Sequence, residues 1–248
     1  MKTVLLLSLL AMSAMTAGSL QAFETDSIPT SSGDLRITFI GHGTLMFGFG
    51  GKVVHVDPWS QLANYGKLPK ADLILVTHEH RDHLDLKAIA AIRKEGTVII
   101  ATEAVANQVK DALVMKNGDV MASQGFTIEA VAAYNLVHMR NPGEPFHPKG
   151  IGNGYIITFG DRRVYIAGDT ENTPEMKALK NIDVAFICMN LPYTMTPAEA
   201  ADGVKAFKPK VVIPYHYRAN PATDVTAFKT ALDGSGVEVR LLEWYPKA

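Results

Sequence analysis

The chain has 248 residues, of which 47% are hydrophobic and 20% charged, and its formal net charge at pH 7 is −1. This composition excludes a disordered or low-complexity protein, and the near-neutral charge gives no general attraction to nucleic acid. Cys188 is the one cysteine, which excludes an internal disulfide and any paired-cysteine zinc or redox motif. A chain of this length can bury a full hydrophobic core without disulfide bonds or structural metal sites.

Residues 1–22 are predicted to be a secretory signal peptide. Lys2 is followed by an apolar run from Val4 to Met15 and by small and polar residues up to Ala22. The run is shorter than the roughly 20 apolar residues that cross a bilayer. We therefore expect cleavage after Ala22, with an uncleaved anchor as the alternative. Residues 23–248 contain no second apolar span and are predicted to be one periplasmic or secreted domain without membrane attachment.

Strands and helices alternate along the rest of the chain. Short apolar or alternating runs predict strands at Leu35–Ile40, Thr44–Phe49, Lys52–Val56, Ala71–Thr77, Thr97–Thr102, Phe126–Ala133, Tyr155–Phe159, Arg163–Ala167, Val184–Cys188, Lys210–Pro214 and Val237–Glu243. Helices are predicted at Leu86–Glu95, Ala104–Val114, Pro197–Phe207 and Ala222–Leu232. Hairpins mixed with strand–helix–strand units indicate a layered α/β protein with mixed sheets. The proline-containing stretch Asn141–Gly154 is expected to be a loop over the surface or over a site.

Three histidines lie within six residues, directly after the continuous apolar strand Ala71–Thr77. Because alternate side chains of an extended segment point to the same side, His78 and His80 can bind one metal ion. Asp82 and His83 follow at the turn into the next helix and can face a second ion. Imidazole and carboxylate ligands suit zinc and other first-row metals, and the spacing differs from the HExxH pattern of helical zinc proteases. The pattern therefore favours a metal site over a polar loop.

This His-x-His-x-Asp-His motif resembles the signature of the metallo-β-lactamase superfamily. Two later segments are similar to that family in order and spacing. One contains Asp169, which resembles the aspartate that bridges two metal ions, and the other ends in His216, which resembles the last histidine ligand. The resemblance covers Leu35 to Tyr245 and implies a four-layer αββα sandwich with mixed sheets and a site where strand ends meet. It also implies two divalent metal ions, with zinc as the first choice and manganese as the alternative.

The opening segments around His42 and Asp57 resemble the first hairpin of the subgroup that contains ascorbate-6-phosphate lactonase-like hydrolases. Asp57 is predicted to accept a hydrogen bond from a metal-binding imidazole, or else to be a turn residue before Pro58. His42 lies between two glycines and is predicted to contact the substrate or a metal-bound group, or else to be a structural turn histidine. His55 alternates with valines and is predicted to point to the opposite face of its strand, away from the chemistry.

One ligand of the family has no direct counterpart. Most members place a histidine after the strand that matches Phe126–Ala133, whereas this chain continues into Tyr134-Asn135. His147 and His138 are the candidates, and a site with neither is the third possibility. We favour His147 because it lies in a turn fixed by prolines and resembles a Phe-His-Pro-Lys-Gly element of the same subgroup. Asn135 would then support the site from behind the ligands or act as a weak oxygen ligand.

The predicted ligand set is His78, His80, Asp82, His83, His147, Asp169 and His216, and Asp82 and His216 are also predicted to take part in catalysis. Zinc lowers the pKa of its bound water from 15.7 to about 7, so metal-bound hydroxide would be the nucleophile. The chain has no Gly-x-Ser-x-Gly motif, and Cys188 lies inside an apolar strand where it is predicted to be a buried filler. Candidates for substrate contact are Tyr193 and two cations, Arg81 and Lys149, either of which could equally be a solvated surface residue.

These patterns predict a secreted hydrolase of small ester-like substrates, namely a lactone, another cyclic ester or a phosphodiester. A β-lactamase and a non-catalytic metal-binding protein are the alternatives. A nuclease is disfavoured by the near-neutral charge and by the lack of an added nucleic-acid domain. The expected partner is a small-molecule substrate, with no nucleic acid. The patterns do not separate the cleavage of C–O, C–N and P–O bonds.

Overall fold

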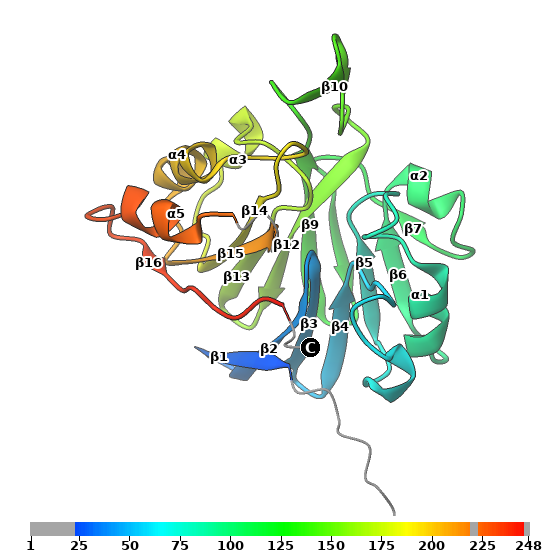
Figure 1. The fold of residues 1–248 in the computed structure, drawn as a ribbon. Coiled ribbons are helices and arrows are strands. Elements are labelled where there is room, and N and C mark those ends of the chain that lie inside the picture. Colours follow the sequence, from blue (N-terminus) through cyan, green and yellow to red (C-terminus); the bar gives the residue numbers. More distant parts are fainter. Residues whose placement is uncertain (1–22, 219–222, 246–248) are drawn as a thin grey trace, which may run out of the picture.

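The structure is a computed structural model that describes residues 23–218 and 223–245. The predicted signal peptide lies outside the described residues. Two seven-stranded sheets pack face to face, and helices cover the outer face of each sheet (Figure 1). This confirms the predicted sandwich of mixed sheets. Within the described ranges, no helix is long and apolar enough to cross a membrane.

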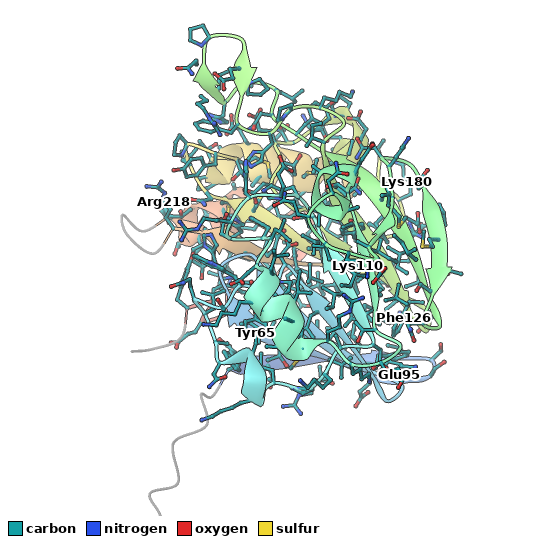
Figure 2. All side chains as sticks on the ribbon, turned by 90° about the vertical axis from the view of Figure 1, so that its right-hand side faces the viewer. Tyr65, Glu95, Lys110, Phe126, Lys180 and Arg218 are labelled. Atoms are coloured by element: carbon teal, nitrogen blue, oxygen red, sulfur yellow. The ribbon has the colours of Figure 1, made fainter. Side chains whose placement is uncertain are left out.

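The first sheet is built from β1 to β7 in chain order, antiparallel from β1 to β4 and parallel from β4 to β7. Its strands are β1 (Glu24–Thr30), β2 (Gly33–Gly41), β3 (Thr44–Phe49), β4 (Lys52–Val56), β5 (Leu73–Val76), β6 (Val98–Ala101) and β7 (Leu113–Val114). Its outer face carries the short helices η1 (Tyr65–Lys67), α1 (Leu86–Ile92) and α2 (Glu103–Ala106). Figure 2 shows this helical face toward the viewer, with Tyr65 of η1 labelled below α1.

The second sheet has the order β8-β9-β12-β13-β14-β15-β16, antiparallel up to β13 and parallel beyond it. Its strands are β8 (Val120–Ser123), β9 (Phe126–Ala133), β12 (Gly152–Phe159), β13 (Arg162–Ile166), β14 (Val184–Met189), β15 (Val211–Tyr217) and β16 (Glu238–Val239). Three helices cover it: α3 (Pro174–Lys177), α4 (Pro197–Phe207) and α5 (Val225–Ala231). The hairpin of β10 (Met139–Asn141) and β11 (Glu144–Pro145) projects from the body of the molecule (Figure 1).

Aromatic side chains fill the space between the two sheets. The rings of Phe47 on β3 and Phe159 on β12 lie 5.3 Å apart, and Phe39 on β2 packs 5.0 Å from Trp244 near the C-terminal end. Each of these side chains is at most 2% exposed. Burial of one such side chain stabilises the fold by roughly 1.5–3 kcal/mol. The two sheets are thus held together as one packed unit, which fixes the positions of the strand ends relative to one another.

The structure differs from the sequence-based expectation at the edges of the sheets. The predicted helix Ala104–Val114 ends at Ala106, and Leu113–Val114 instead pairs in parallel with β6. Leu113 and Val114 pair with the open edge of the sheet instead of continuing the predicted helix. The predicted last strand is reduced to Glu238–Val239, and the polar edge strands β1 and β8 were not predicted. Edge strands bury few side chains, so they leave a weak apolar pattern in the sequence.

Candidate metal centre

The side chains singled out by the sequence gather at one edge of the sandwich, where strands of both sheets end. His42 follows β2, Asp57 follows β4, His78 comes shortly after β5, Asp169 comes shortly after β13, and His216 is the penultimate residue of β15. His42, Asp57 and His216 have positive φ angles of 48°, 46° and 45°. Such conformations cost a non-glycine residue about 1–3 kcal/mol and concentrate at functional sites, because the surroundings must enforce them.

Three histidines form the first cluster. Nε2 of His78 lies 3.1 Å from Nδ1 of His80, and the His147 ring stands 4.9 Å from that of His80. The potential ligand atoms of the three residues all lie within 4.8 Å of one another. Oδ2 of Asp169 lies 3.2 Å from Nε2 of His147, so a carboxylate also faces this cluster.

The second cluster lies on the other side of Asp169. Nε2 of His83 and Nε2 of His216 are 2.9 Å apart. Oδ1 of Asp169 is 3.4 Å from the first of these nitrogens and 3.2 Å from the second. Oδ2 of Asp82 lies 3.5 Å from Nε2 of His216. The two oxygens of Asp169 therefore face two different sets of nitrogen atoms, which is the arrangement expected of a bridging carboxylate.

Two of these buried atoms have no hydrogen-bond partner among the described residues. Nε2 of His147 and Oδ1 of Asp169 are buried, and neither takes part in a hydrogen bond. An unpaired buried polar atom costs roughly 1–3 kcal/mol. Imidazole nitrogens with carboxylate oxygens are the donor set that zinc and other first-row metals prefer. The residues present therefore fit divalent metal ions in two adjacent clusters.

The charges of the second cluster favour ionised carboxylates. Burial opposes ionisation of Asp169, but His216 and His83 outweigh it and hold the pKa of this carboxyl well below its ordinary value. Burial also opposes protonation of His83, yet the carboxylates of Asp169, Asp57 and Asp82 outweigh it and raise the pKa of His83 to about 10. The centre thus holds an excess of buried negative charge that a proton on His83 partly neutralises, and a cation can take the place of that proton.

Asp57 orients His83 from behind. Its carboxylate accepts hydrogen bonds from the backbone N–H and the hydroxyl of Thr77, each at 2.7 Å. Nδ1 of His83 lies 2.7 Å from Oδ2 of Asp57. Because an ionised carboxylate can only accept, Nδ1 carries a proton, so Nε2 faces the centre and offers its lone pair once a cation has taken the place of the second proton. The position agrees with the predicted role of Asp57 as a hydrogen-bond acceptor for a metal-binding imidazole.

Asn135 orients His147 in the same way. Its Nδ2 donates to Glu171 Oε1 at 2.9 Å and to the carbonyl oxygen of Tyr193 at 2.8 Å, which fixes the amide orientation. Its Oδ1 therefore faces His147 and accepts from the backbone N–H of His147 at 2.6 Å. Nδ1 of the His147 ring lies 2.9 Å from the same oxygen. The Nε2 lone pair of His147 is left pointing at Asp169. Asn135 thus supports a histidine from behind and does not itself reach the clusters.

The competing candidate, His138, points elsewhere. Its Nε2 lies 3.2 Å from Oε2 of Glu199 at the start of α4, and it belongs to neither cluster. Lys149 is also turned away, because its Nζ contacts Glu175 at 2.9 Å. His55 is buried on the outer face of the first sheet, where its Nε2 lies 3.1 Å from the carbonyl oxygen of Pro69.

His42 is in direct contact with two of the predicted ligands, Asp82 and His216. Its Nε2 is 3.0 Å from Oδ2 of Asp82, and its ring centroid is 3.9 Å from that of His216. Its carbonyl oxygen accepts from the backbone N–H of His216 at 3.0 Å and from the indole N–H of Trp244. A side chain on the neighbouring Gly43 would place its Cβ 2.8 Å from His216 and 3.0 Å from His83, so glycine is needed there for this approach.

Comparison with known proteins identifies the family. Residues 36–216 match the model of a β-lactamase superfamily domain. The chain is also 33% identical over 237 residues to a UPF0173 metal-dependent hydrolase of Anaeromyxobacter dehalogenans, with 85% of each chain covered. The chain belongs to the UPF0173 family of metal-dependent hydrolases in the metallo-β-lactamase superfamily.

Solved structures agree with this assignment. The crystal structure of a protein described as a metal-dependent hydrolase from Parabacteroides distasonis shares 49% identity with the chain, at a TM-score of 0.84, and covers 89% of this chain and 98% of its own. The metallo hydrolase Igni18 from Ignicoccus hospitalis shares 26% identity at a TM-score of 0.70, with 85% and 96% covered. The resemblance to the narrower ascorbate-6-phosphate lactonase-like subgroup stays a prediction.

In this UPF0173 protein the metal centre opens into a cavity of about 810 Å³, large enough for a small molecule. The wall includes His42, His80, Asp82, His147 and Asp169 from the centre. It also includes Tyr193 and Arg81, the two of the three candidates for substrate contact that line this cavity. The cavity therefore gives a ligand access to both clusters at once.

Several residues of this site are not predicted from the sequence. The buried carboxylate of Glu171 accepts from Asn135 and from the backbone N–H groups of residues 136, 137 and 138, at 2.7 to 2.9 Å, and so holds the loop behind His147. The sequence signal for Glu171 was an acidic residue two positions after Asp169, close behind an apolar strand. Arg140, Phe146 and Asn190 also line the cavity, and only the folding of their loops brings them there.

Proposed function

We propose that this UPF0173 hydrolase cleaves a small ester-like substrate, a lactone, another cyclic ester or a phosphodiester, by direct attack of water. One observation carries the proposal: a buried carboxylate, Asp169, presents one oxygen to each of two imidazole clusters at the floor of an open cavity. Divalent ions held there, zinc or manganese, would supply an activated water and an electrophile for the oxygen of the scissile bond. The remaining chemistry belongs to side chains of the chain itself.

Asp82 is placed to orient the attacking water. Its side chain is 30% exposed, against 5% for Asp169, so it is the centre carboxylate that reaches furthest into the cavity. Burial opposes its ionisation, but His83, His216 and His42 outweigh it and hold the pKa of the Asp82 carboxyl well below its ordinary value. Asp82 is therefore an acceptor at neutral pH, and His42, 3.0 Å from its Oδ2, fixes its direction.

No side chain of the described cavity wall is a thiol or an aliphatic hydroxyl that could act as a nucleophile. Cys188 is fully buried, and burial raises the pKa of its thiol to about 12. A thiol with such a pKa is almost entirely protonated at neutral pH and is a poor nucleophile. These facts support attack by water without a covalent enzyme intermediate.

The test combines metal analysis with hydrolysis. The purified protein, reloaded with zinc or with manganese, should contain close to two metal ions per chain by elemental analysis. It should then hydrolyse members of a panel of lactones, phosphodiesters and β-lactams, and single-turnover hydrolysis in labelled water should place the label in the product. A trapped acyl- or phosphoryl-enzyme, or a protein that takes up only trace metal, would overturn the proposal.

Export is a separate part of the proposal and rests on residues 2–22. A full-length chain expressed in a bacterium should appear in the periplasmic fraction with a new N-terminus at residue 23. Recovery of the intact chain from the cytoplasm would contradict it.

A further inference from the structure

Three arginines line the cavity around the metal centre. Arg81 comes from the loop after β5, Arg140 from β10 and Arg218 from the segment directly after β15, so three separate segments bring a positive charge to one space. Figure 2 labels Arg218 at the edge of the molecule. No described carboxylate forms an ion pair with any of the three. Their charge is therefore available to a ligand.

None of the acidic side chains of the cavity wall forms an ion pair with these arginines among the described residues. Asp82 and Asp169 face the histidine clusters and are occupied there, which leaves Glu79 as the other carboxylate in the wall. The contrast with Lys149 is informative. That cation was also a candidate for substrate contact, but it is paired with Glu175, whereas the cavity arginines are left without a carboxylate.

Two of the arginines are backed by aromatic rings. The guanidinium of Arg140 lies 5.8 Å above the ring centre of Phe146, and that of Arg218 lies 5.5 Å above the ring centre of Tyr193. The two rings pack edge to face at 5.0 Å, so the pairs form one continuous wall. A guanidinium that rests on a ring uses its flat face, and its N–H groups at the edge stay free to bind a carboxylate or phosphate in a fork.

We propose that the substrate carries an anionic group, a carboxylate or a phosphate, next to a flat or apolar portion. Arg140 and Arg218 would bind the anion, with Arg81 adding charge, while Phe146 and Tyr193 contact the apolar portion. This inference rests on the proposed function, since it names the substrate class of the same site. The cavity volume of about 810 Å³ suits a small molecule.

Arg140 gives the cleaner test. Arg218 also donates from Nε to Oδ1 of Asn190 at 3.2 Å, and Nδ2 of Asn190 lies 3.3 Å from Nδ1 of His216. A change at Arg218 can therefore disturb a residue of the metal centre. Arg140 is exposed on a hairpin, where its guanidinium lies over the ring of Phe146 and forms no ion pair with a described carboxylate, so Arg140→Met should leave the fold and the centre intact. Arg93→Met is the matched control, because Arg93 pairs with Asp111 and does not line the cavity.

The experiment measures binding by calorimetry to the zinc-loaded full chain. Three probes are used: benzoate and phenylphosphonate, which are anionic and not hydrolysed, and the neutral benzamide. We expect at least one anion to bind roughly 10-fold or more tightly than benzamide, and Arg140→Met to weaken it roughly 10- to 100-fold. Arg93→Met should change nothing. Preference for benzoate would indicate a carboxylate substrate, and preference for phenylphosphonate a phosphate.

Other outcomes would overturn the inference. These are equal binding of benzamide and the anions, no binding of either anion, or anion binding that Arg140→Met leaves unchanged, which would mean that the metal ions alone hold the anion. Hydrolysis is measured separately. A protein that hydrolyses none of the panel but binds an anion through Arg140 would refute the proposed function and keep this inference. A protein that hydrolyses the panel but binds no anion through Arg140 would keep the proposed function and refute this inference.

Discussion

The metal centre and the outer face of the first sheet each contain a fully buried histidine. His83 in the centre and His55 on β4 are both 0% exposed. His83 is surrounded by carboxylates, which raise its pKa to about 10. His55 has one polar partner, the carbonyl oxygen of Pro69, and burial lowers its pKa to about 4.

The difference shows that burial alone does not mark a functional histidine. What separates the two regions is the supply of negative charge and of oriented acceptors. Nδ1 of His83 contacts Asp57, which leaves Nε2 of His83 directed at the other predicted ligands. Nδ1 of His55 is buried with no hydrogen-bond partner among the described residues, and no carboxylate is paired with that ring. The centre is arranged for a cation, and the region of His55 is arranged for a neutral ring.

The sharpest test of the centre compares two histidines of one loop region. His147→Ala should lower metal affinity by more than the roughly 10- to 100-fold that loss of a supporting residue costs, because it removes a nitrogen from the first cluster. His138→Ala should have little effect, because that ring contacts Glu199 instead. Competition with a chelator measures both. The reverse ranking would make His138 the ligand.

A second comparison uses two buried or partly buried aspartates. Asp57→Asn should weaken metal binding roughly 10- to 100-fold, because an amide has one oxygen to accept from the three donors that the carboxylate now satisfies. Asp85→Asn is the control. Asp85 caps α1 and accepts from Ser60, so its change should cost about 1 kcal/mol of stability or less and leave metal affinity unchanged. Equal losses of metal from the two variants would show that Asp57 is only structural.

The third prediction concerns stability on the outer face. In the unfolded chain His55 takes up a proton below its ordinary pKa of 6.5, whereas in the folded chain it does so only below about 4. The unfolded state therefore binds more protons between these values, and stability falls as the pH is lowered through this window. From pH 7 to pH 5 the loss from this one group is about 2 kcal/mol.

Denaturant unfolding of the wild-type chain and of His55→Leu measures this effect. The variant should lose about 2 kcal/mol less of its unfolding free energy than the wild type between the two pH values. Subtracting one protein from the other cancels the titration of the metal centre, which both share. Parallel pH profiles would contradict the neutral state of His55.

How much of this was readable from the sequence depends on how local each feature is. His78, His80, Asp82 and His83 follow one apolar strand within a few residues, so their closeness is dictated by strand geometry. Asp169 and His216 were found only through family resemblance, because their meeting depends on the pairing of distant strands. The partners of Asn135 and the arginine–aromatic wall could not be predicted, since loop packing decides them and no periodic pattern encodes it.

The smallest expected effect tests whether nearness to the centre is enough to give a residue a role. Cys188 lies in β14, and its Sγ is 3.4 Å from the carbonyl oxygen of Thr170, the residue after Asp169. Burial raises the pKa of its thiol to about 12, and the negative charge of Asp169 acts in the same direction. Cys188→Ala should therefore keep the metal content and the hydrolytic rate. It should cost about 1 kcal/mol of stability, from the small cavity left in a packed core. Loss of activity in a folded Cys188→Ala protein with its full metal content would show that the thiol takes part in the reaction, against both its burial and its pKa.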